Sequence, residues 1–233
     1  MSISDMLPQQ CVLCGGDLIG PASLCLSCQD ELPWPLHPCH RCGIELGLQP
    51  PDHGHCGSCL SDPPAFDRCF APFRYEYPVR ELIASFKFNA RFAEGQALAQ
   101  LLAEFVTSVY RPEDRPGCLL PVPLHPQRLR ERGYNQSMEL ARAIGRRCRI
   151  PVVTRYCQRT RSTRSQKGLS ADERAVNLHN AFALNPGALP ALPDHVAIVD
   201  DVVTTMATVS AAARLLRGAG HRRIDVICLA RVS

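Results

Sequence analysis

The chain has 233 residues, of which 45% are hydrophobic, and a formal net charge of +4 at pH 7. This length suffices for one full hydrophobic core and a small additional module, and so mild a charge does not by itself demand an acidic partner. No apolar run is long enough to cross a bilayer. The N-terminus MSISDMLPQQC lacks the basic start and hydrophobic segment of a signal peptide, so we expect a cytoplasmic protein without membrane insertion.

The N-terminal segment is rich in cysteine. Eight of the 13 cysteines form four C-x-x-C pairs, and glycine follows the first pair of each half, at Gly15 and Gly43. A C-x-x-C-G turn directs two thiolates to one side, and the glycine allows the positive φ that closes the turn. In a reducing compartment such thiols are metal ligands rather than disulfides. We therefore expect two structural Zn2+ sites, with the ligands Cys11, Cys14, Cys25, Cys28, Cys39, Cys42, Cys56 and Cys59.

The pairing of these ligands stays open at this stage. Sequential pairing is the simplest arrangement, and an interleaved one fits the same spacing. His40, His53 and His55 lie nearby and are either substitutes for a cysteine or surface residues. The segment has few large apolar residues, so metal binding is expected to supply its stability.

From residue 68 the pattern changes to alternating strands and helices. In chain order the sequence predicts a strand over 69–77, helices over 78–88 and 93–110, a strand from 118, a basic helix over 134–149, strands over 152–156 and 196–200, a helix over 208–218 and a strand over 224–232. This alternation is typical of an α/β domain with a mainly parallel sheet and helices on both faces. With the prolines at 63 and 64 as a boundary, we expect a double zinc ribbon over 1–62 and the α/β domain over 63–233.

The stretch VAIVDDVVTTMATVS, at 196–210, ends a buried strand in two adjacent carboxylates. Ligands of parallel sheets bind beyond the carboxyl ends of the strands, and the first N–H groups of the next helix attract an anion. Carboxylates repel phosphate, so Asp200 and Asp201 require sugar hydroxyls or Mg2+ as partners. A ribose 5-phosphate offers both chemistries. Three hydroxyl donors lie in the same turn: Thr204, Thr205 and Thr208.

This stretch resembles the ribose-phosphate-binding loop of type I phosphoribosyltransferases, where two acidic residues precede a T-T-G-x-T or T-G-x-T loop. From about residue 11 onward the whole chain resembles the ComF family, the ComFC and GntX-like proteins. The matching segments are the cysteine ribbon, Phe86-Lys87-Phe88, the block PVPLHPQRLRERGYNQS at 121–137, Arg161 with Gln166 and Asn177-Leu178, and Leu229-Ala230-Arg231.

The resemblance implies a type I phosphoribosyltransferase-like domain behind the zinc ribbon. It implies that Asp200 and Asp201 contact the ribose of phosphoribosyl pyrophosphate, bound with Mg2+, and act catalytically if a transfer occurs. The segment 121–124 would lie beside the pyrophosphate, and 159–169 would form a lid. Lys87 and Arg132 either neutralise pyrophosphate or are surface charges. The expected substrate contacts are Asp200, Asp201, Val202, Val203, Thr204, Thr205, Met206, Ala207, Thr208, Lys87, Arg132 and Arg161.

Met206 departs from the family pattern, which has glycine at this position. A left-handed residue with a side chain costs roughly 1–2 kcal/mol more than glycine. Either the loop adopts another local geometry, or phosphate binds more weakly, or the methionine side chain turns away from the pocket.

Two functions follow. Family members are linked to DNA uptake in natural transformation or to the use of DNA as a nutrient, so the first is a phosphoribosyltransferase-like protein of DNA uptake or nucleotide metabolism. The alternative is a non-catalytic protein that binds single-stranded DNA or a partner of the DNA-uptake machinery. The segment 128–174 favours contact with phosphates, because it contains 13 Lys and Arg against 4 Asp and Glu.

Overall fold

A computed structural model describes residues 9–18, 22–89, 91–160, 181–185, 187 and 193–233. In chain order its elements are β1 (Gln9–Gln10), β2 (Asp17–Leu18), α1 (Leu26–Asp30), α2 (Gly57–Ser61), β3 (Arg68–Phe70), β4 (Phe73–Arg74), α3 (Val79–Phe88), α4 (Phe92–Val109), the 3-10 helix η2 (Pro112–Asp114), β5 (Cys118–Pro121), α5 (Pro126–Arg132), α6 (Gln136–Cys148), β6 (Cys157–Arg159), β7 (Phe182–Leu184), β8 (His195–Val203), α8 (Ala207–Gly218) and β9 (Arg223–Arg231).

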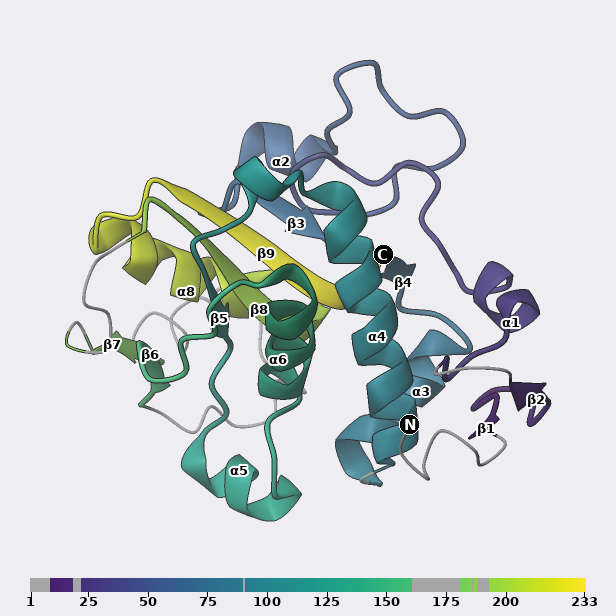
Figure 1. Cartoon of the computed structure of the whole chain (residues 1–233). Helices are drawn as coiled ribbons and strands as arrows, with labels where there is room; N and C mark the ends of the chain where they lie inside the picture. Colours follow the sequence, from purple (N-terminus) through teal and green to yellow (C-terminus); the bar gives the residue numbers. More distant parts are fainter. Residues whose placement is uncertain (1–8, 19–21, 90, 161–180, 186, 188–192) are drawn as a thin grey trace.

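The main sheet is parallel, with the strand order β3-β9-β8-β5, and β4 continues the edge by pairing with β9 beyond β3. The long strands β8 and β9 run side by side from the pair His195–Arg223 to the pair Val203–Arg231. Both are mostly apolar, with the runs 196–199 in β8 and 226–230 in β9, as expected of strands that are covered on both faces. All carboxyl ends of the strands therefore lie at one edge of the sheet, where Figure 1 shows the loop into α5 and α6.

Helices cover both faces of the sheet and enclose two cores. Successive side chains of a strand point to opposite faces. On one face Ala197 and Val199 of β8 pack with α3, α4 and α6. On the other face Val196 and Ile198 pack with α8. The expected α/β class, with a parallel sheet between helices and a Cys-rich N-terminal module, is confirmed.

Several expected boundaries were wrong. The strand expected over 152–156 is absent: residue 152 makes only an isolated bridge to Leu119, and the strand forms later, at β6. The strand expected over 69–77 is split into β3 and β4, because Pro72 has no N–H to donate to a ladder. Helix α5 was not expected, since its seven residues are too few and too charged to show a helical apolar stripe.

A buried charge cluster occupies the amino edge of the sheet. Asp225 is fully buried and accepts hydrogen bonds from the Tyr110 hydroxyl at 2.7 Å and from His195 Nε2 at 2.9 Å. Arg68 and Arg223 lie 3.6 and 3.5 Å from the same carboxylate oxygen. Burial opposes ionisation, but these partners hold the pKa of Asp225 below its ordinary value. The cluster joins β3, β8, β9 and the end of α4 at the edge of the sheet that is remote from Asp200 and Asp201.

The eight paired cysteines form two four-sulfur clusters. Within each cluster the ligand atoms lie within 4.8 Å of one another, and the clusters are Cys11, Cys14, Cys25 and Cys28, then Cys39, Cys42, Cys56 and Cys59. Pairing is thus sequential, and no histidine belongs to either group among the described residues. Gly15 and Gly43 have positive φ values of 72° and 71°, as the knuckle turn requires.

Both clusters have the chemistry of a structural zinc site. Four thiolates around one point match the tetrahedral preference of Zn2+. Backbone N–H groups already point at the sulfurs, for example from Cys25 to Cys11 at 3.5 Å and from Cys56 to Cys39 at 3.3 Å. Burial opposes ionisation of Cys11 and Cys39, but these N–H groups lower the pKa of each thiol to about 6. The ligand-competent thiolate is therefore favoured at one cysteine of each cluster, whereas burial raises the pKa of Cys42 in the second cluster to about 11.

Each ribbon contacts the α/β domain. Cys11 and Leu24 of the first ribbon belong to the same buried cluster as Phe73 of β4. In the second ribbon the carbonyl of Arg41 accepts a hydrogen bond from the N–H of Cys69 at 2.8 Å. Figure 1 shows α2 above β3 and α1 on the side of the molecule where α3 and α4 lie. Within the part of the chain that is described, no helix is both long and apolar enough to cross a membrane.

We predict two zinc ions per chain. Elemental analysis of protein purified without chelator should give two, and Cys11→Ser should give one, because it removes a ligand from the first cluster only. Cys157→Ser is the matched control, since this cysteine is half-buried and outside both clusters, and it should keep two ions. Wild-type protein with one zinc ion or none would contradict the two-site assignment.

Candidate functional site

The candidate site lies where β8 ends. Asp200 and Asp201 are the sixth and seventh residues of this strand, and two valines separate them from the loop before α8. The two carboxylates are approached by two helices that cover the same face of the sheet, Asp201 by α3 and Asp200 by α6.

Lys87, from the last turn of α3, forms an ion pair with Asp201. The distance between Lys87 Nζ and Asp201 Oδ1 is 2.9 Å, and the side chains are 18% and 12% exposed. Removing either partner would leave the other charge largely desolvated and unpaired. The structure thus places Lys87 on the carboxylate pair rather than on the outer surface.

Asp200 is held from α6 and by its own neighbour. The Ser137 hydroxyl donates to Asp200 Oδ1 at 3.0 Å, and the N–H of Asp201 donates to the same oxygen at 2.9 Å. Burial and the adjacent Asp201 charge raise the pKa of Asp200 to about 7, although Lys87 and the two donors act in the opposite direction. One of the two carboxylates therefore changes charge near neutral pH.

The loop after β8 surrounds a small hollow of about 30 Å3. That is about the volume share of one water molecule, so a phosphate would lie at its mouth rather than inside. Helix α8 has 12 residues, and its first N–H groups face this loop without helical partners. The residues that line the hollow are Asp200, Val202, Val203, Thr204, Thr205, Met206, Ala207, Thr208 and Val209.

Met206 takes the left-handed conformation that glycine takes in the family pattern, with φ 62°. Its half-buried side chain packs on the buried cysteines of the second cluster and on the core beneath α8. Fully burying a methionine side chain contributes about 1.5–3 kcal/mol, so this partial burial compensates part of the roughly 1–2 kcal/mol of left-handed strain. Of the three alternatives for this residue, the structure supports a retained turn with the side chain directed to the ribbon.

Arg231, the last residue of β9, joins the second ribbon to the loop. Its side chain is buried, and Nε donates to the carbonyl of Cys42 at 3.1 Å. Nη1 donates to the carbonyl of Val203 at 3.1 Å and also to that of Thr204. Sequence reasoning assigned this arginine no role. The available signal was a charged residue that ends an otherwise apolar strand.

The substrate contacts expected from sequence are largely brought together. All nine residues from 200 to 208 follow one another along the end of β8, its loop and the start of α8. The side chain of Val203 is buried in one core and that of Val202 packs on the other, so only their backbone is available there. Arg132 lies at the end of α5, near α6. Arg161 and most of the expected lid lie outside the described residues.

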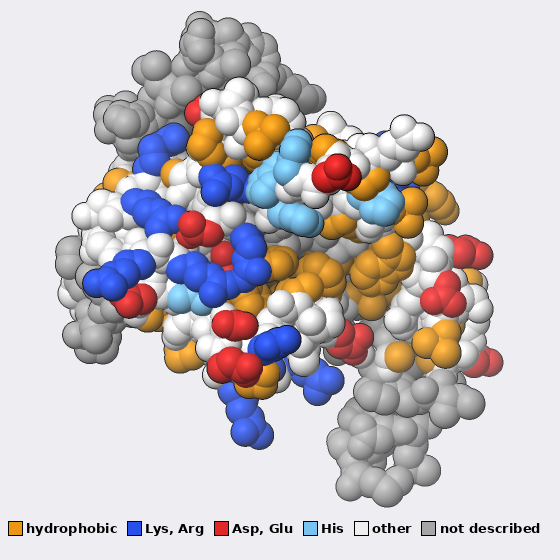
Figure 2. All heavy atoms as spheres, turned by 90° about the horizontal axis from the view of Figure 1, so that it is seen from above, with side chains coloured by type: hydrophobic (Ala, Val, Ile, Leu, Met, Phe, Trp, Pro, Cys, Tyr) orange, Lys and Arg blue, Asp and Glu red, His pale blue; other side chains and the backbone are white. Residues whose placement is uncertain are grey.

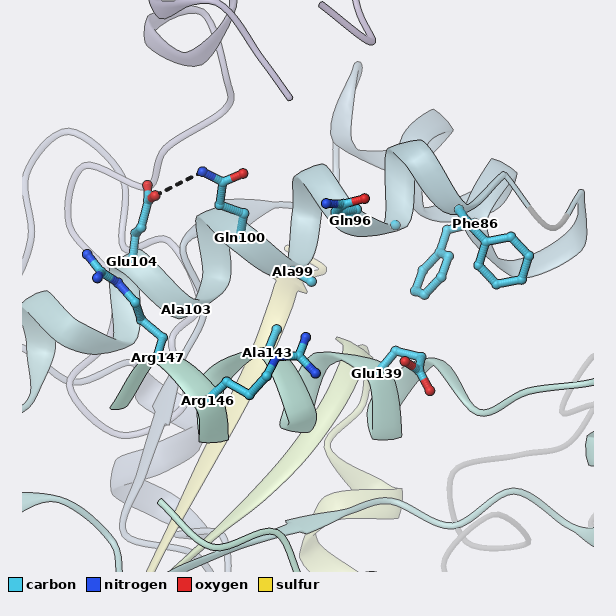
Figure 3. A pocket seen from close by; sticks show the side chains of 12 residues that line it. Phe86, Gln96, Ala99, Gln100, Ala103, Glu104, Glu139, Ala143, Arg146 and Arg147 are labelled. Atoms are coloured by element: carbon cyan, nitrogen blue, oxygen red, sulfur yellow. Dashed lines mark hydrogen bonds between the residues drawn. The ribbon is translucent and has the colours of Figure 1, made fainter. Parts of the chain in front are cut away.

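A larger groove runs between α4 and α6, with a volume of about 740 Å3. Figure 3 shows Gln96, Gln100 and Glu104 along its α4 side and Glu139, Arg146 and Arg147 along its α6 side. Small residues, including Ala99, Ala103 and Ala143, form the floor. Sequence reasoning missed this groove, because small residues at helical spacing carry no signal of a ligand.

The face seen in Figure 2 carries Lys and Arg side chains next to a group of histidines. Three histidines of the second ribbon lie near one another: the ring centroids of His40 and His55 are 5.7 Å apart, and those of His53 and His55 are 6.2 Å apart. None of them belongs to the described metal clusters. They are therefore surface groups beside a basic area.

The raised pKa of Asp200 predicts how stability depends on pH. A carboxyl held at about 7 in the folded chain, against about 3.9 when unfolded, favours folding below pH 4, and this contribution is lost as the pH rises to 7. Asp200→Asn stays neutral, so its Tm relative to wild type should rise by several degrees between pH 4 and pH 8, at about 2–4 °C per kcal/mol. Thermal melts of both proteins and of the control Asp114→Asn, an exposed carboxylate of η2, measure this. A difference that stays constant with pH would contradict the assignment.

Comparison with known proteins identifies relatives along nearly the whole chain. Residues 3–60 match a family described as a double zinc ribbon domain. Competence protein F of Haemophilus influenzae is 37% identical over 95% of this chain and 96% of its own length. DNA utilization protein YhgH of Escherichia coli K12 is 36% identical over 97% of this chain and 98% of its own length.

Solved structures show a weaker likeness. A hypoxanthine phosphoribosyl transferase of Trypanosoma cruzi is 17% identical over 59% of this chain and 64% of its own, with a TM-score of 0.38, which is too low to support an argument about the pocket. The sequence relatives are decisive, since their identity extends through both the cysteine ribbons and the α/β domain. The chain belongs to the ComF family, which includes competence protein F and DNA utilization protein YhgH.

Proposed function

We propose that the carboxyl edge of β8 binds phosphoribosyl pyrophosphate or a related ribose 5-phosphate compound, and that the protein acts in the uptake or use of DNA. The observation that carries the proposal is the order of groups along this edge. Two acceptor carboxylates are followed at once by a left-handed turn and the start of a 12-residue helix. Anion donors and hydroxyl acceptors are thus a few residues apart, as a sugar phosphate requires.

In this proposal the 5-phosphate lies at the mouth of the small hollow. The N–H groups at the start of α8 and the hydroxyls of Thr204, Thr205 and Thr208 donate to it. Asp200 and Asp201 face the ribose hydroxyls, which are donors that tolerate the negative charge. Ionisation of Asp200 and Asp201 strengthens ribose binding, because hydrogen bonds to a charged acceptor contribute about 1.5–3 kcal/mol each.

Lys87 supplies the positive charge nearest to the carboxylates. In the ligand-free chain it neutralises Asp201 at 2.9 Å. With a pyrophosphate bound at C1 of the ribose, the same ammonium is placed to face the pyrophosphate oxygens as well. Mg2+ bound with the ligand would supply further charge neutralisation. If transfer occurs, the two carboxylates stabilise the positive charge that develops on the ribose ring.

The DNA-related role rests on the relatives. Two proteins that match almost the whole chain are named a competence protein and a DNA utilization protein. The basic segment 128–174 supplies groups that contact a phosphate backbone. A non-catalytic protein that binds single-stranded DNA through this segment is the second candidate. Product analysis after incubation with phosphoribosyl pyrophosphate, Mg2+ and nucleobases separates turnover from binding alone.

Removing both carboxylates should abolish ligand binding. In calorimetric titration with phosphoribosyl pyrophosphate, the wild type should bind and Asp200→Asn/Asp201→Asn should lose about 10- to 100-fold or more in affinity, because two charged acceptors are lost. Glu139→Gln is the control, a carboxylate of the α4–α6 groove that should leave affinity unchanged. A wild type that binds no ribose 5-phosphate compound at millimolar concentration, or a double variant that binds like wild type, would disprove the proposal.

DNA binding should depend steeply on salt. On single strands the slope of log K against log salt is about −0.7 per phosphate contacted. Reversing the charge of two exposed arginines of α6, Arg146→Glu/Arg147→Glu, should weaken binding and flatten the slope. Arg214→Glu/Arg222→Glu makes the same charge change outside the basic segment and should have a smaller effect. Equal losses in the two variants, or binding that ignores salt, would argue against a site on α6.

A further inference from the structure

Two phenylalanines lie exposed at the junction of α3 and α4. Phe88 is 72% exposed and Phe92 is 60% exposed. Together with Arg132 and Tyr134 they form what we call the ring surface. Aromatic side chains account for only 6% of the whole chain, so two exposed rings in one small area call for a ligand.

The members of the ring surface are held in defined positions. The guanidinium carbon of Arg132 lies 5.2 Å from the centroid of the Phe88 ring, a cation–π arrangement. The Tyr134 ring lies 5.1 Å from Phe92 and 5.4 Å from the buried Phe86. The Tyr134 hydroxyl donates to the carbonyl of Phe86. One side of the surface is thus packed on the protein, and Phe88 stays open to solvent.

Two short paths connect this surface to the carboxylates. Lys87 precedes Phe88 in α3, and its Nζ lies 2.9 Å from Asp201. From the other side, Arg132 donates to Gln136 Oε1 at 3.0 Å. The next residue, Ser137, donates to Asp200 at 3.0 Å. The ring surface is therefore linked to the carboxylate pair through neighbouring residues of α3 and of α6.

The amides at the start of α6 add a second observation. Gln136 is 1% exposed and uses its oxygen for Arg132, while its Nε2 has no partner among the described residues. Asn135 donates to the carbonyl of Val122 at 3.0 Å, and its Oδ1 likewise lacks a described partner. An unused acceptor and an unused donor thus lie on the two residues that precede Ser137. Buried polar atoms without partners are costly, and polar ligand atoms or water are what satisfies them.

We propose that the ring surface stacks the nucleobase of a ligand whose ribose lies on Asp200 and Asp201. This inference rests on the proposed function. It adds that the group attached to the bound ribose, or accepting it, is a nucleobase. A nucleobase offers a flat π-face to Phe88 and Arg132, and every base stacks in this way, so little base selectivity is expected. A phosphate-rich ligand fits the ring surface less well, because Asp200 and Asp201 would repel it.

The α4–α6 groove is not part of this assignment. Phe86 and Phe92 lie at one of its ends, and Figure 3 shows the labelled Phe86 ring there. Phe88 and Arg132 do not line the groove. Away from that end, its polar sides and small-residue floor offer no stacking face, and a nucleobase is accordingly assigned to Phe88.

The test compares two ligands that differ only in the base. Ribose 5-phosphate and adenosine 5′-monophosphate are titrated calorimetrically into wild type and Phe88→Leu. In wild type the nucleotide should bind about 5- to 150-fold more tightly than the sugar phosphate, the usual range for stacking on one aromatic ring. Phe88→Leu should lose most of this advantage and leave ribose 5-phosphate affinity unchanged. Tyr77→Leu, which removes another ring that is 75% exposed, should behave like wild type.

The outcomes separate the two proposals. If wild type binds neither ligand, the proposed function fails and this inference fails with it. If wild type binds ribose 5-phosphate but gains nothing from the base, or if Phe88→Leu keeps the gain, the stacking assignment is overturned and the sugar-phosphate site stands. Thymine and abasic oligonucleotides form a second arm. A loss in Phe88→Leu that is confined to the thymine oligonucleotide would assign the rings to a DNA strand and overturn the proposal for the nucleotide.

Discussion

Two adjacent carboxylates at the end of a buried strand are the constraint around which the rest of the site is arranged. Burial raises the pKa of Asp200, and the adjacent charge of Asp201 adds to the effect, so Asp200 titrates near pH 7. Two helices supply partners for the carboxylates. Lys87 of α3 lies 2.9 Å from Asp201, and the Ser137 hydroxyl of α6 donates to Asp200 at 3.0 Å. Nothing in the packing of the sheet calls for the second carboxylate. An arrangement that costs stability and recruits two helices for compensation is expected where a ligand is bound.

The second cysteine ribbon is joined to the same loop. Arg231 donates to the carbonyl of Cys42 in the ribbon and to the carbonyls of Val203 and Thr204 in the loop. Met206 packs its side chain on the cysteine cluster from the opposite end of the turn. The ribbon therefore supplies part of the core on which the loop is built. This explains how the turn accommodates a methionine in a conformation that otherwise favours glycine.

Much of this architecture is predictable from the sequence. The cysteine pairs, the helices α3, α4, α6 and α8 and the long central strands carry strong local signals, because C-x-x-C-G turns and apolar periodicity depend on neighbours in the chain. The contacts of Lys87, Arg132 and Arg231 are not predictable in this way, since each depends on elements that are distant in sequence. The prediction of a strand over 152–156 was wrong for a related reason, because strand pairing also depends on distant segments. Residue 152 forms only a single bridge, to Leu119. The elements of the fold can thus be predicted from local sequence signals. The site depends on tertiary contacts, which local signals do not reveal.

The most direct measurement is a crystal structure of the protein with ribose 5-phosphate bound. The account predicts the phosphate at the mouth of the hollow, against the first N–H groups of α8, and the ribose hydroxyls within hydrogen-bonding distance of Asp200 and Asp201. A phosphate seated in the α4–α6 groove or on the basic surface, with both carboxylates free of the sugar, would contradict it.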